Sequence, residues 1–156
     1  MVRQKNLTLT FIINGDKILL GLKKRGFGLG RYNGFGGKIE EGESIEEAAA
    51  REVFEESNLA VNSLEKIGRL NFTFDYNSED LLVHVFKTSN FSGQAEESAE
   101  MKPQWFDIKN IPYKKMWPDD IYWLPLILDN KKIQASFLFG KKDKIVKQSI
   151  SIVEQL

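Results

Sequence analysis

The chain has 156 residues, of which 42% are hydrophobic, 12% aromatic and 28% charged, a composition typical of one globular domain covering residues 1–156. Its 22 basic and 22 acidic side chains balance, which excludes a net field that would attract nucleic acid. The lack of cysteine excludes disulfides and thiolate sites, and a single histidine, His84, excludes multi-histidine metal sites. A metal site must therefore use oxygen ligands, which suit magnesium, manganese or calcium.

No stretch near the start predicts a signal sequence or a membrane span. The apolar run at residues 7–13 is short, contains two threonines and ends at Asn14-Gly15. We therefore expect an intracellular, cytoplasmic protein with no membrane partner, and leave a mitochondrial or nuclear share open. Basic residues are not interleaved with aromatic ones on a strand, so no nucleic acid polymer is expected as a partner. The default expectation for assembly is a monomer.

The first half of the chain predicts a hairpin, a loop and a helix. Residues 7–13 and 17–22 are rich in β-branched and aliphatic side chains and flank an Asn-Gly turn. Residues 25–37 hold six glycines in thirteen positions, which predicts a loop that brings backbone close to another group. Ser44, with a glutamate three residues later, predicts a capping box, and Asn58 suits the left-handed residue that ends a helix.

The second half predicts further strands and one more helix on the same sheet. The expected elements are strands at 66–76, 81–88 and 104–108, a polar loop at 90–100, a helix from Pro118-Asp-Asp120 to about Leu128, and a hairpin of 133–139 with 144–153 around Gly140. This order of elements indicates an α/β protein with one mixed sheet and helices packed against it.

The first helix carries three carboxylates on one side. Glu52, Glu55 and Glu56 occupy an arc of about 100° at 100° per residue. Such a cluster is ordinarily a solvated acidic face. Here the same side of the helix holds Ile45, Ala48 and Ala49, which should face the sheet, so the carboxylates border the buried side and need a compensating cation. Beside a glycine-rich loop and nearby lysines, this pattern predicts a magnesium–phosphate site that cleaves a phosphoanhydride.

The segment from Gly37 to Leu59 resembles the Nudix box: glycine, five residues, glutamate, seven residues, then Arg-Glu-aliphatic-x-Glu-Glu-x-Gly-aliphatic. Only Asn58 departs, at the position of the last glycine. The resemblance implies an α/β/α sandwich around a central mixed β-sheet. It also implies hydrolysis of a nucleoside diphosphate linked to another group, with Mg²⁺, or Mn²⁺ in its place.

A wider resemblance links the chain to the animal oxidised purine nucleoside triphosphate hydrolases, often called MutT homologues. The segments that carry it are Lys23-Lys-Arg-Gly-Phe-Gly28, Asn33-Gly-Phe-Gly-Gly-Lys38, His84-Val-Phe86, Glu97-Ser-Ala-Glu-Met101, Pro103, Trp105-Phe106 and Met116-Trp-Pro-Asp-Asp120. The resemblance implies release of pyrophosphate from 8-oxo-dGTP and 2-hydroxy-dATP, which leaves the monophosphate and removes mutagenic precursors of DNA from the nucleotide pool.

The resemblance also implies roles for the acidic residues. The implied metal ligands are Gly37 through its carbonyl, Glu52, Glu55, Glu56 and Glu100; the implied catalytic group comprises Glu56, Glu52, Glu100 and Arg51. Glu56 is the first choice for the carboxylate that matters most to turnover, while Glu100 stays a rival for activating water. Arg51 is expected to orient the carboxylates, because it lies off their arc.

The substrate is expected to bind in a pocket that ends at this box. The implied residues are Lys23 and Lys38 for the phosphates, the backbone of Phe35, Gly36 and Gly37, Asn33 for a purine edge, Trp117 for stacking, Thr8, Phe27, Phe72 and Leu81 for the wall, and Asp119 and Asp120 for reading the base. Without the resemblance, the adjacent aspartates would be helix-start residues favoured by the helix dipole, and the aromatic residues would serve equally well as core.

Alternative functions remain at this point. The same box would serve another nucleotide, such as O6-methyl-dGTP, a nucleotide sugar or a dinucleoside polyphosphate. A chain of another class would be a nucleotide-binding module without catalysis, although the acidic residues of the box are all present. His84 lies in an apolar strand and is expected to be structural rather than catalytic.

Overall fold

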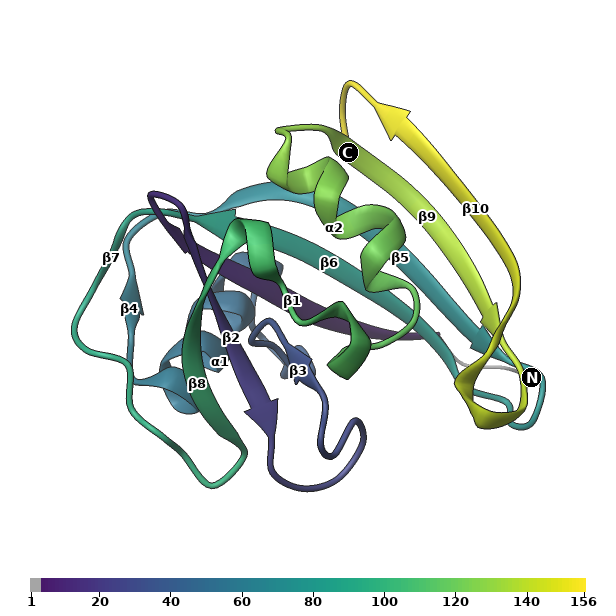
Figure 1. Ribbon diagram of the computed structural model, residues 1–156, viewed down its shortest axis with the longest axis horizontal. Coiled ribbons are helices and arrows are strands. Elements are labelled where there is room, and N and C mark those ends of the chain that lie inside the picture. Colours follow the sequence, from purple (N-terminus) through teal and green to yellow (C-terminus); the bar gives the residue numbers. More distant parts are fainter. Residues whose placement is uncertain (1–3) are drawn as a thin grey trace.

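The computed structural model describes residues 4–156, in which a mixed sheet lies between helices (Figure 1). The strands of this sheet are β1 (Gln4–Asn14), β2 (Lys17–Lys23), β3 (Tyr32–Asn33), β5 (Glu65–Phe74), β6 (Asp80–Thr88), β8 (Met101–Asp107), β9 (Lys132–Phe139) and β10 (Ile145–Val153). Their order is β10-β9-β5-β6-β1-β2-β3, and β8 also pairs with β2. The pairs β1–β6 and β5–β9 are parallel and the others antiparallel, so the expected mixed sheet is confirmed.

Helix α1 (Ile45–Ser57) packs behind the sheet in the view of Figure 1. Its capping box is complete, because the Ser44 side chain accepts from the backbone N–H of Glu47 and the Glu47 side chain accepts from that of Ser44. Asn58 ends the helix in the left-handed conformation with φ 67°, as expected for an asparagine in place of glycine. Both ends of α1 are therefore fixed by local sequence.

Helix α2 (Asp120–Leu128) covers the opposite face of the sheet (Figure 1). It buries Trp123, whose ring meets Phe11 of β1 edge-on at 5.8 Å. Three short 3-10 turns connect the later strands: η1 (Ile108–Asn110), η2 (Tyr113–Lys115) and η3 (Lys141–Asp143). The turn η3 joins β9 and β10 into the expected antiparallel hairpin.

The glycine-rich segment is more regular than its composition predicts. Within the expected loop at 25–37, β3 pairs with β2, and Phe35 forms a bridge with Thr10 of β1. The polar segment at 90–100 likewise contains β7 (Phe91–Ser92), which pairs with β4 (Ala60–Val61) in a separate small sheet. Strand β8 begins at Met101 rather than 104, because its backbone continues to pair with β2 as far as Lys23.

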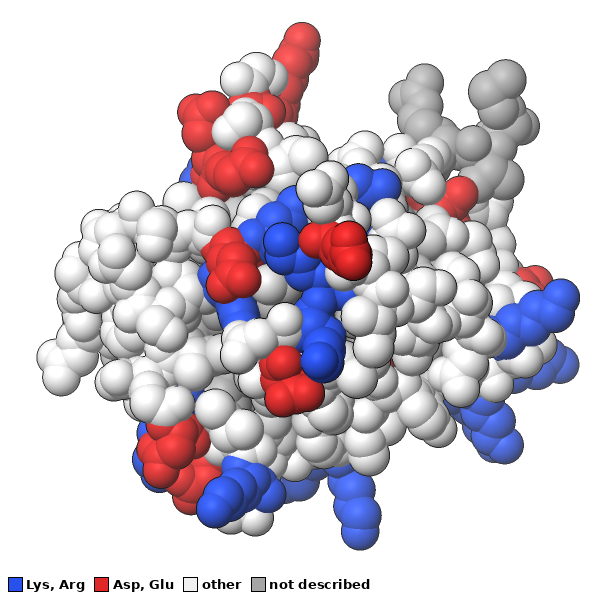
Figure 2. Space-filling model, turned by 90° about the horizontal axis from the view of Figure 1, so that it is seen from above, with Lys and Arg blue, Asp and Glu red and all other residues white. Residues whose placement is uncertain are grey.

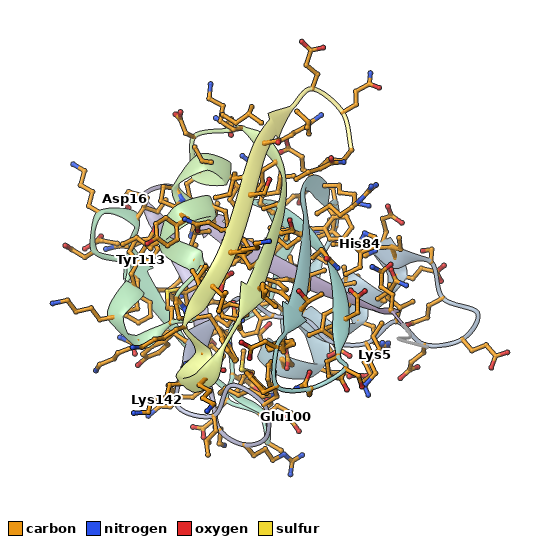
Figure 3. The ribbon with its side chains drawn as sticks, turned by 90° about the vertical axis from the view of Figure 1, so that its right-hand side faces the viewer. Lys5, Asp16, His84, Glu100, Tyr113 and Lys142 are labelled. Carbon is orange, nitrogen blue, oxygen red and sulfur yellow. The ribbon has the colours of Figure 1, made fainter. Side chains whose placement is uncertain are left out.

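His84 has a structural environment in the sheet (Figure 3). It is buried, its Nδ1 lies 3.0 Å from Lys66 Nζ, and its Nε2 lies 3.0 Å from Asn6 Oδ1. An ammonium group can only donate, so Nδ1 accepts and Nε2 carries the proton of a neutral ring. Burial, together with the charges of Lys66 and Arg69, lowers the pKa of His84 to about 4.

Charged side chains of both signs are interspersed on the face shown in Figure 2, in keeping with the balanced composition. None of the helices in residues 4–156 is both long and apolar enough to cross a membrane.

Candidate functional site

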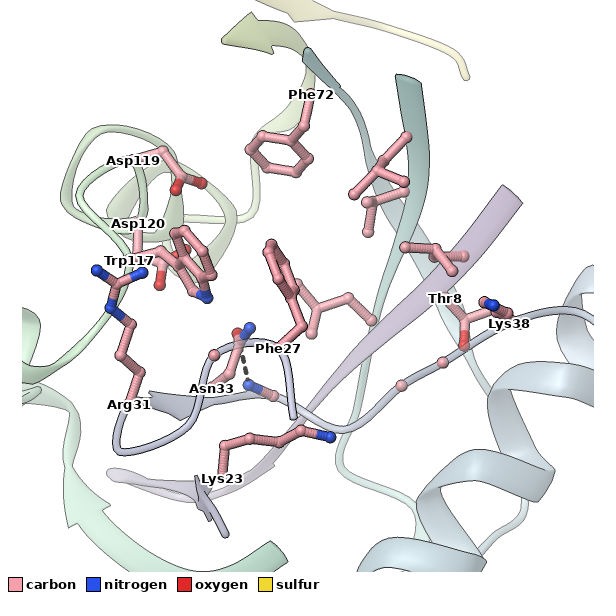
Figure 4. A pocket seen from close by; sticks show the side chains of 18 of the residues that line it. Thr8, Lys23, Phe27, Arg31, Asn33, Lys38, Phe72, Trp117, Asp119 and Asp120 are labelled. Carbon is pink, nitrogen blue, oxygen red and sulfur yellow. Dashed lines mark hydrogen bonds between the residues drawn. The ribbon is translucent and has the colours of Figure 1, made fainter. Parts of the chain in front are cut away.

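A cavity of about 360 Å³ lies between the sheet, the glycine-rich segment and the residues that lead into α2 (Figure 4). Strands β1, β5 and β6 supply one wall, and the segment from Lys23 to Lys38 supplies another. The predicted substrate residues that line it are Thr8, Lys23, Phe27, Asn33, Gly36, Gly37, Lys38, Phe72, Leu81, Trp117, Asp119 and Asp120. Residues far apart in the sequence thus share one pocket, with Glu56 at its lining.

Phe35 is the exception among the predicted substrate residues. Its side chain is fully buried in a small core cluster with Val53 and Met101, on the side of α1. Its backbone N–H and C=O are both hydrogen bonded to Thr10, at 2.9 and 2.7 Å. Phe35 is therefore absent from the pocket lining, and its backbone groups already pair with those of β1.

Glu56 lies at the wall of the pocket on the last turn of α1. Its side chain is buried, and Oε1 accepts a hydrogen bond of 2.9 Å from the backbone N–H of Gly36. Burial raises the pKa of Glu56 to about 7; the Gly36 bond opposes this shift, and the charge of Glu52 adds to it. The carboxyl group can therefore exchange a proton near neutral pH.

Glu52 packs directly against Gly37 one helical turn earlier. A Cβ atom at Gly37 would lie 2.6 Å from the Glu52 carboxyl carbon, so only glycine leaves room for this approach. Burial raises the pKa of Glu52, and its hydrogen bond from Arg51 opposes the shift. The requirement for glycine at the start of the box is thus a matter of space beside a carboxylate.

Arg51 holds the acidic side chains together without lining the pocket. It donates to both carboxylate oxygens of Glu43 at 2.6 and 2.9 Å, to Glu52 at 3.0 Å and to Glu55 at 3.2 Å. A further bond of 3.0 Å reaches the carbonyl of Lys38. The planar guanidinium therefore fixes the loop and the helix of the box relative to each other.

Glu100 forms ion pairs with two basic residues and is not part of the Arg51 cluster. It accepts from Lys23 Nζ at 3.0 Å and from Arg25 Nε at 2.7 Å, and these bonds lower its pKa. Glu55 is exposed and faces Arg51. In the part of the chain that the structure describes, no three Asp, Glu or His side chains are arranged to ligate one metal ion. Glu55 and Glu100 thus each have a cationic partner, as Glu52 does through Arg51.

The oxygen donors near Gly37 nevertheless fit a hard divalent cation. The Glu56 carboxyl lies at the pocket with a backbone N–H as its hydrogen-bond partner and with no ion pair among residues 4–156. The Glu52 carboxylate lies close to Gly37 and its charge acts on Glu56, while the Gly37 carbonyl accepts a hydrogen bond of 2.9 Å from the backbone N–H of Thr8. Two carboxylates with raised pKa values, the buried Glu56 and the half-buried Glu52, are stabilised by a positive ion, and oxygen ligands suit magnesium or manganese.

The other end of the pocket carries polar groups without partners. Asp119 and Asp120 are both buried, and Asp119 Oδ2 accepts from Trp123 Nε1 at 2.7 Å. Oδ2 of Asp120 has no hydrogen-bond partner within the described chain, and Oγ1 of Thr8, which lies beside Lys38 nearer the box (Figure 4), also has none there. Burial raises the pKa of Asp119 to about 6 and that of Asp120 well above its usual range. Such orphaned groups in a cavity are suited to a polar ligand.

Aromatic side chains form the apolar part of this end. Phe27 stacks on Trp117 with ring centroids 4.9 Å apart and an interplanar angle of 30°. A purine between the two rings would need a separation of roughly 7 Å, which is two contact distances. Phe27 is 64% exposed on its loop, so it must move if a base is to lie on that face of Trp117.

Several lining residues were not expected from the sequence. They are Leu7, Leu9, Gly28, Arg31, Gly34, Phe74, Val83, Met101, Trp123 and Phe139. Strand alternation carries enough information for Phe74 and Val83, which lie two residues from the predicted Phe72 and Leu81 and so share their face. No comparable sequence pattern identifies Arg31.

The family model of the NUDIX domain matches residues 4–127. The chain belongs to the NUDIX domain family. As a member of this family it is an enzyme, as the sequence of the box predicts. The C-terminal hairpin of β9 and β10 lies beyond the matched residues but continues the same sheet.

The NUDIX chain is 49% identical over 156 residues to an oxidized purine nucleoside triphosphate hydrolase from Danio rerio, covering all of both proteins. It is 47% identical over 147 residues to the protein of the same name from Mus musculus, covering 94% of each. Its fold is similar to the crystal structure of a mutator MutT protein from Bacillus halodurans, with a TM-score of 0.85, 22% identity and coverage of 94% of this chain and 97% of that one.

Proposed function

We propose that the protein hydrolyses oxidised purine nucleoside triphosphates, such as 8-oxo-dGTP and 2-hydroxy-dATP, to the monophosphate and pyrophosphate. The observation that carries this proposal is that a single pocket connects charged residues beside the NUDIX box with two aspartates that lie among aromatic rings. Glu56, Lys23 and Lys38 line it beside the NUDIX box, while Asp119 and Asp120 line it between aromatic side chains. The names of the Danio rerio and Mus musculus relatives support the same substrate class.

The end of the pocket beside the NUDIX box, which we assign to the phosphates, carries charged side chains. Lys23 and Lys38 line the pocket near the carboxylates and would attract the triphosphate. We propose Mg²⁺ as the metal, with Mn²⁺ as a substitute, held by Glu52, Glu56 and the Gly37 carbonyl. When bound, such an ion neutralises phosphate charge and lowers the pKa of water. Glu56 is the better candidate for accepting a proton from water, because its carboxyl group lines the pocket with no ion pair among residues 4–156, whereas Lys23 and Arg25 occupy that of Glu100.

The base end is built for hydrogen bonding. The two aspartates differ in their surroundings, so one can accept a hydrogen bond while its protonated neighbour donates. Exchange of these states would let the pair meet the edges of both oxidised guanine and oxidised adenine. Asn33 adds an amide whose Oδ1 is oriented by the N–H of Gly34 at 2.8 Å (Figure 4).

We propose a monomer as the working unit. We propose action on free nucleotides in the cytoplasm, by one domain that covers residues 1–156.

The test is metal-dependent release of pyrophosphate from 8-oxo-dGTP, 2-hydroxy-dATP, O6-methyl-dGTP, dGTP and ADP-ribose. The Glu56→Ala variant should lose the activity, and Glu46→Ala, on the exposed part of the same helix, should keep it. Fast release from the oxidised purines supports the proposal. Activity on ADP-ribose alone would overturn the assigned base pocket, and no activity on any nucleotide would favour a binding module without catalysis.

A further inference from the structure

Arg31 occupies the wall of the pocket in a position that the proposed reaction does not explain. Its guanidinium carbon lies 3.9 Å from the centroid of the Trp117 ring. Its Nη2 lies 3.2 Å from Oδ2 of Asp143. Figure 4 shows Arg31 and Phe27 on opposite sides of Trp117. The Arg31 guanidinium therefore lies against one face of the Trp117 indole, and the other face is turned toward Phe27, which lines the pocket.

Asp143 is itself fixed in place. It lies in η3, the turn between β9 and β10, and its Oδ1 accepts a hydrogen bond of 3.0 Å from the hydroxyl of Tyr76. Lys142 and Asp143 both adopt positive φ, at 59° and 57°, a conformation that is unfavourable for residues other than glycine. Such a turn persists where contacts on both sides hold it, and Arg31 and Tyr76 supply them.

A planar guanidinium is suited to this double contact. It is attracted to the face of an indole and can donate in its own plane to a carboxylate at the same time. A lysine ammonium would keep the charge and lose the flat surface. The chain Tyr76–Asp143–Arg31–Trp117 thus connects the C-terminal hairpin to the aromatic ring at the base end of the pocket. Arg31 also opposes the raised pKa values of Asp119 and Asp120.

We propose that Arg31, anchored by Asp143, is a positioning residue that holds Trp117 as the platform for the purine ring. This inference rests on the proposed function for the identity of the ligand. Arg31 then contributes to recognition of the base and not to binding of the phosphates or to the chemical step.

The first experiment needs no substrate. In protein labelled with 5-fluorotryptophan, the three tryptophans give separate fluorine NMR signals, and Trp117→Phe assigns one of them. Arg31→Gln and Asp143→Asn should each shift the Trp117 signal, with the thermal unfolding midpoint recorded for every variant. Arg69→Gln, on the other face of the sheet, is the matched control and should leave it in place. An unshifted Trp117 signal in Arg31→Gln would overturn the proposal.

The second experiment distinguishes a role of Arg31 in binding the base from a role in binding the phosphates. Affinities are measured for 8-oxo-dGTP, 8-oxo-dGMP and the free nucleoside, with kcat and KM for the triphosphate. Arg31→Gln should weaken all three ligands by the same factor, about tenfold for loss of a partly buried cation–π contact, with kcat within about twofold of wild type. Arg31→Lys should recover part of the loss, and Arg31→Gln with Asp143→Asn should be no weaker than Arg31→Gln alone.

A factor that shrinks as phosphates are removed would make Arg31 a phosphate ligand and overturn the proposal, as would a fall in kcat at unchanged KM. If wild-type protein hydrolyses no oxidised purine, the proposed function fails. The fluorine signals then still decide whether Arg31 and Asp143 position Trp117.

Discussion

Asp119 and Asp120 are neighbours in the chain with unequal hydrogen bonding: Oδ2 of Asp119 accepts from Trp123 Nε1 at 2.7 Å, whereas Oδ2 of Asp120 has no partner in the described chain. An N–H donor favours the ionised form of the carboxyl group that accepts from it. Burial and the adjacent charge of Asp119 favour the protonated form of Asp120. The pair therefore offers an acceptor at Asp119 and a donor at Asp120 when a base arrives.

Replacing each aspartate by asparagine should change the choice of substrate in different ways. Asp119→Asn keeps an acceptor for Trp123 but removes the ionisable acceptor, and Asp120→Asn makes the donor permanent. We expect the ratio of kcat/KM for 8-oxo-dGTP over 2-hydroxy-dATP to differ between the two variants by about tenfold, the value of one good hydrogen bond. Steady-state kinetics on both substrates checks this. Equal losses on both substrates in both variants would contradict the exchange of protonation states.

Asp120 should also make the protein less stable as the pH rises. Its folded pKa lies well above that of an unfolded aspartate, so the folded state binds the extra proton, and stability is lost as the pH rises above about 4 toward the folded pKa. Asp120→Asn removes this loss. We expect its unfolding midpoint to exceed that of wild type by roughly 3 °C or more at pH 8, and by less at pH 5. Thermal unfolding from pH 5 to 8 checks the slope, and parallel curves for the two proteins would exclude the mechanism.

The elements most fully predictable from sequence are those fixed by neighbours in the chain. Ser44 and Asn58 define the ends of α1 through local hydrogen bonds and backbone conformation, and the observed bounds agree. The bridge between Phe35 and Thr10 has no such local cause. Glycines on both sides of Phe35 predict irregular backbone, but its aromatic ring is buried against α1, and burial of that ring decides the outcome.

The residues of the candidate site likewise fall into those that the sequence could place and those that it could not. Residues of the box and of the Trp117–Asp120 segment could be placed from the sequence because short motifs carry them. Arg31 could not, because its role depends on Asp143, which lies 112 positions later and has no motif of its own. The role of Glu100 cannot be settled from the sequence for a related reason. Its sequence context predicts a metal ligand, whereas its hydrogen bonds with Lys23 and Arg25 depend on how segments far apart in the chain meet.

Two adjacent glycines of the box segment should respond differently to alanine. A Cβ at Gly37 would meet the Glu52 carboxyl at 2.6 Å, and that flexible side chain can move away. We expect Gly37→Ala to fold and to lose at least about tenfold in kcat, because the carboxylate is displaced. A Cβ at Gly36 would lie 1.7 Å from the Thr8 carbonyl oxygen, so β1 itself must shift, and we expect Gly36→Ala to lose about 1–3 kcal/mol of stability or more.

Gly42→Asn is the control for this pair. Its φ of 85° suits asparagine better than other side chains, and nothing lies within 4 Å of an added Cβ. Urea unfolding and kcat should both stay close to wild type. A Gly37→Ala variant with full activity would mean that the position of Glu52 is unimportant for turnover.

His84 should make the protein sensitive to acid. Its folded pKa is about 4 against 6.5 for the unfolded side chain, so the unfolded chain binds more protons between these values. The stabilising contribution of the neutral ring is complete above pH 6.5 and is lost as the pH falls toward 4. We expect wild type to lose more stability than His84→Gln between pH 7 and pH 5, as measured by urea unfolding. A steeper loss in the variant would show that another group dominates in this range.

A conservative substitution of Arg51 tests whether kcat depends on the geometry of the NUDIX box rather than on its charge. Arg51→Lys keeps one positive charge but replaces a planar fork that contacts Glu43, Glu52 and Glu55 by a single ammonium group. Because Arg51 does not line the pocket, we expect kcat to fall by about tenfold or more with KM within about twofold of wild type. Lys66→Arg, beside His84 and outside the pocket lining, is a control for exchange of the two basic residues. A rise in KM at unchanged kcat would instead place Arg51 in contact with the nucleotide, and the expected role of orienting Glu52 would be lost.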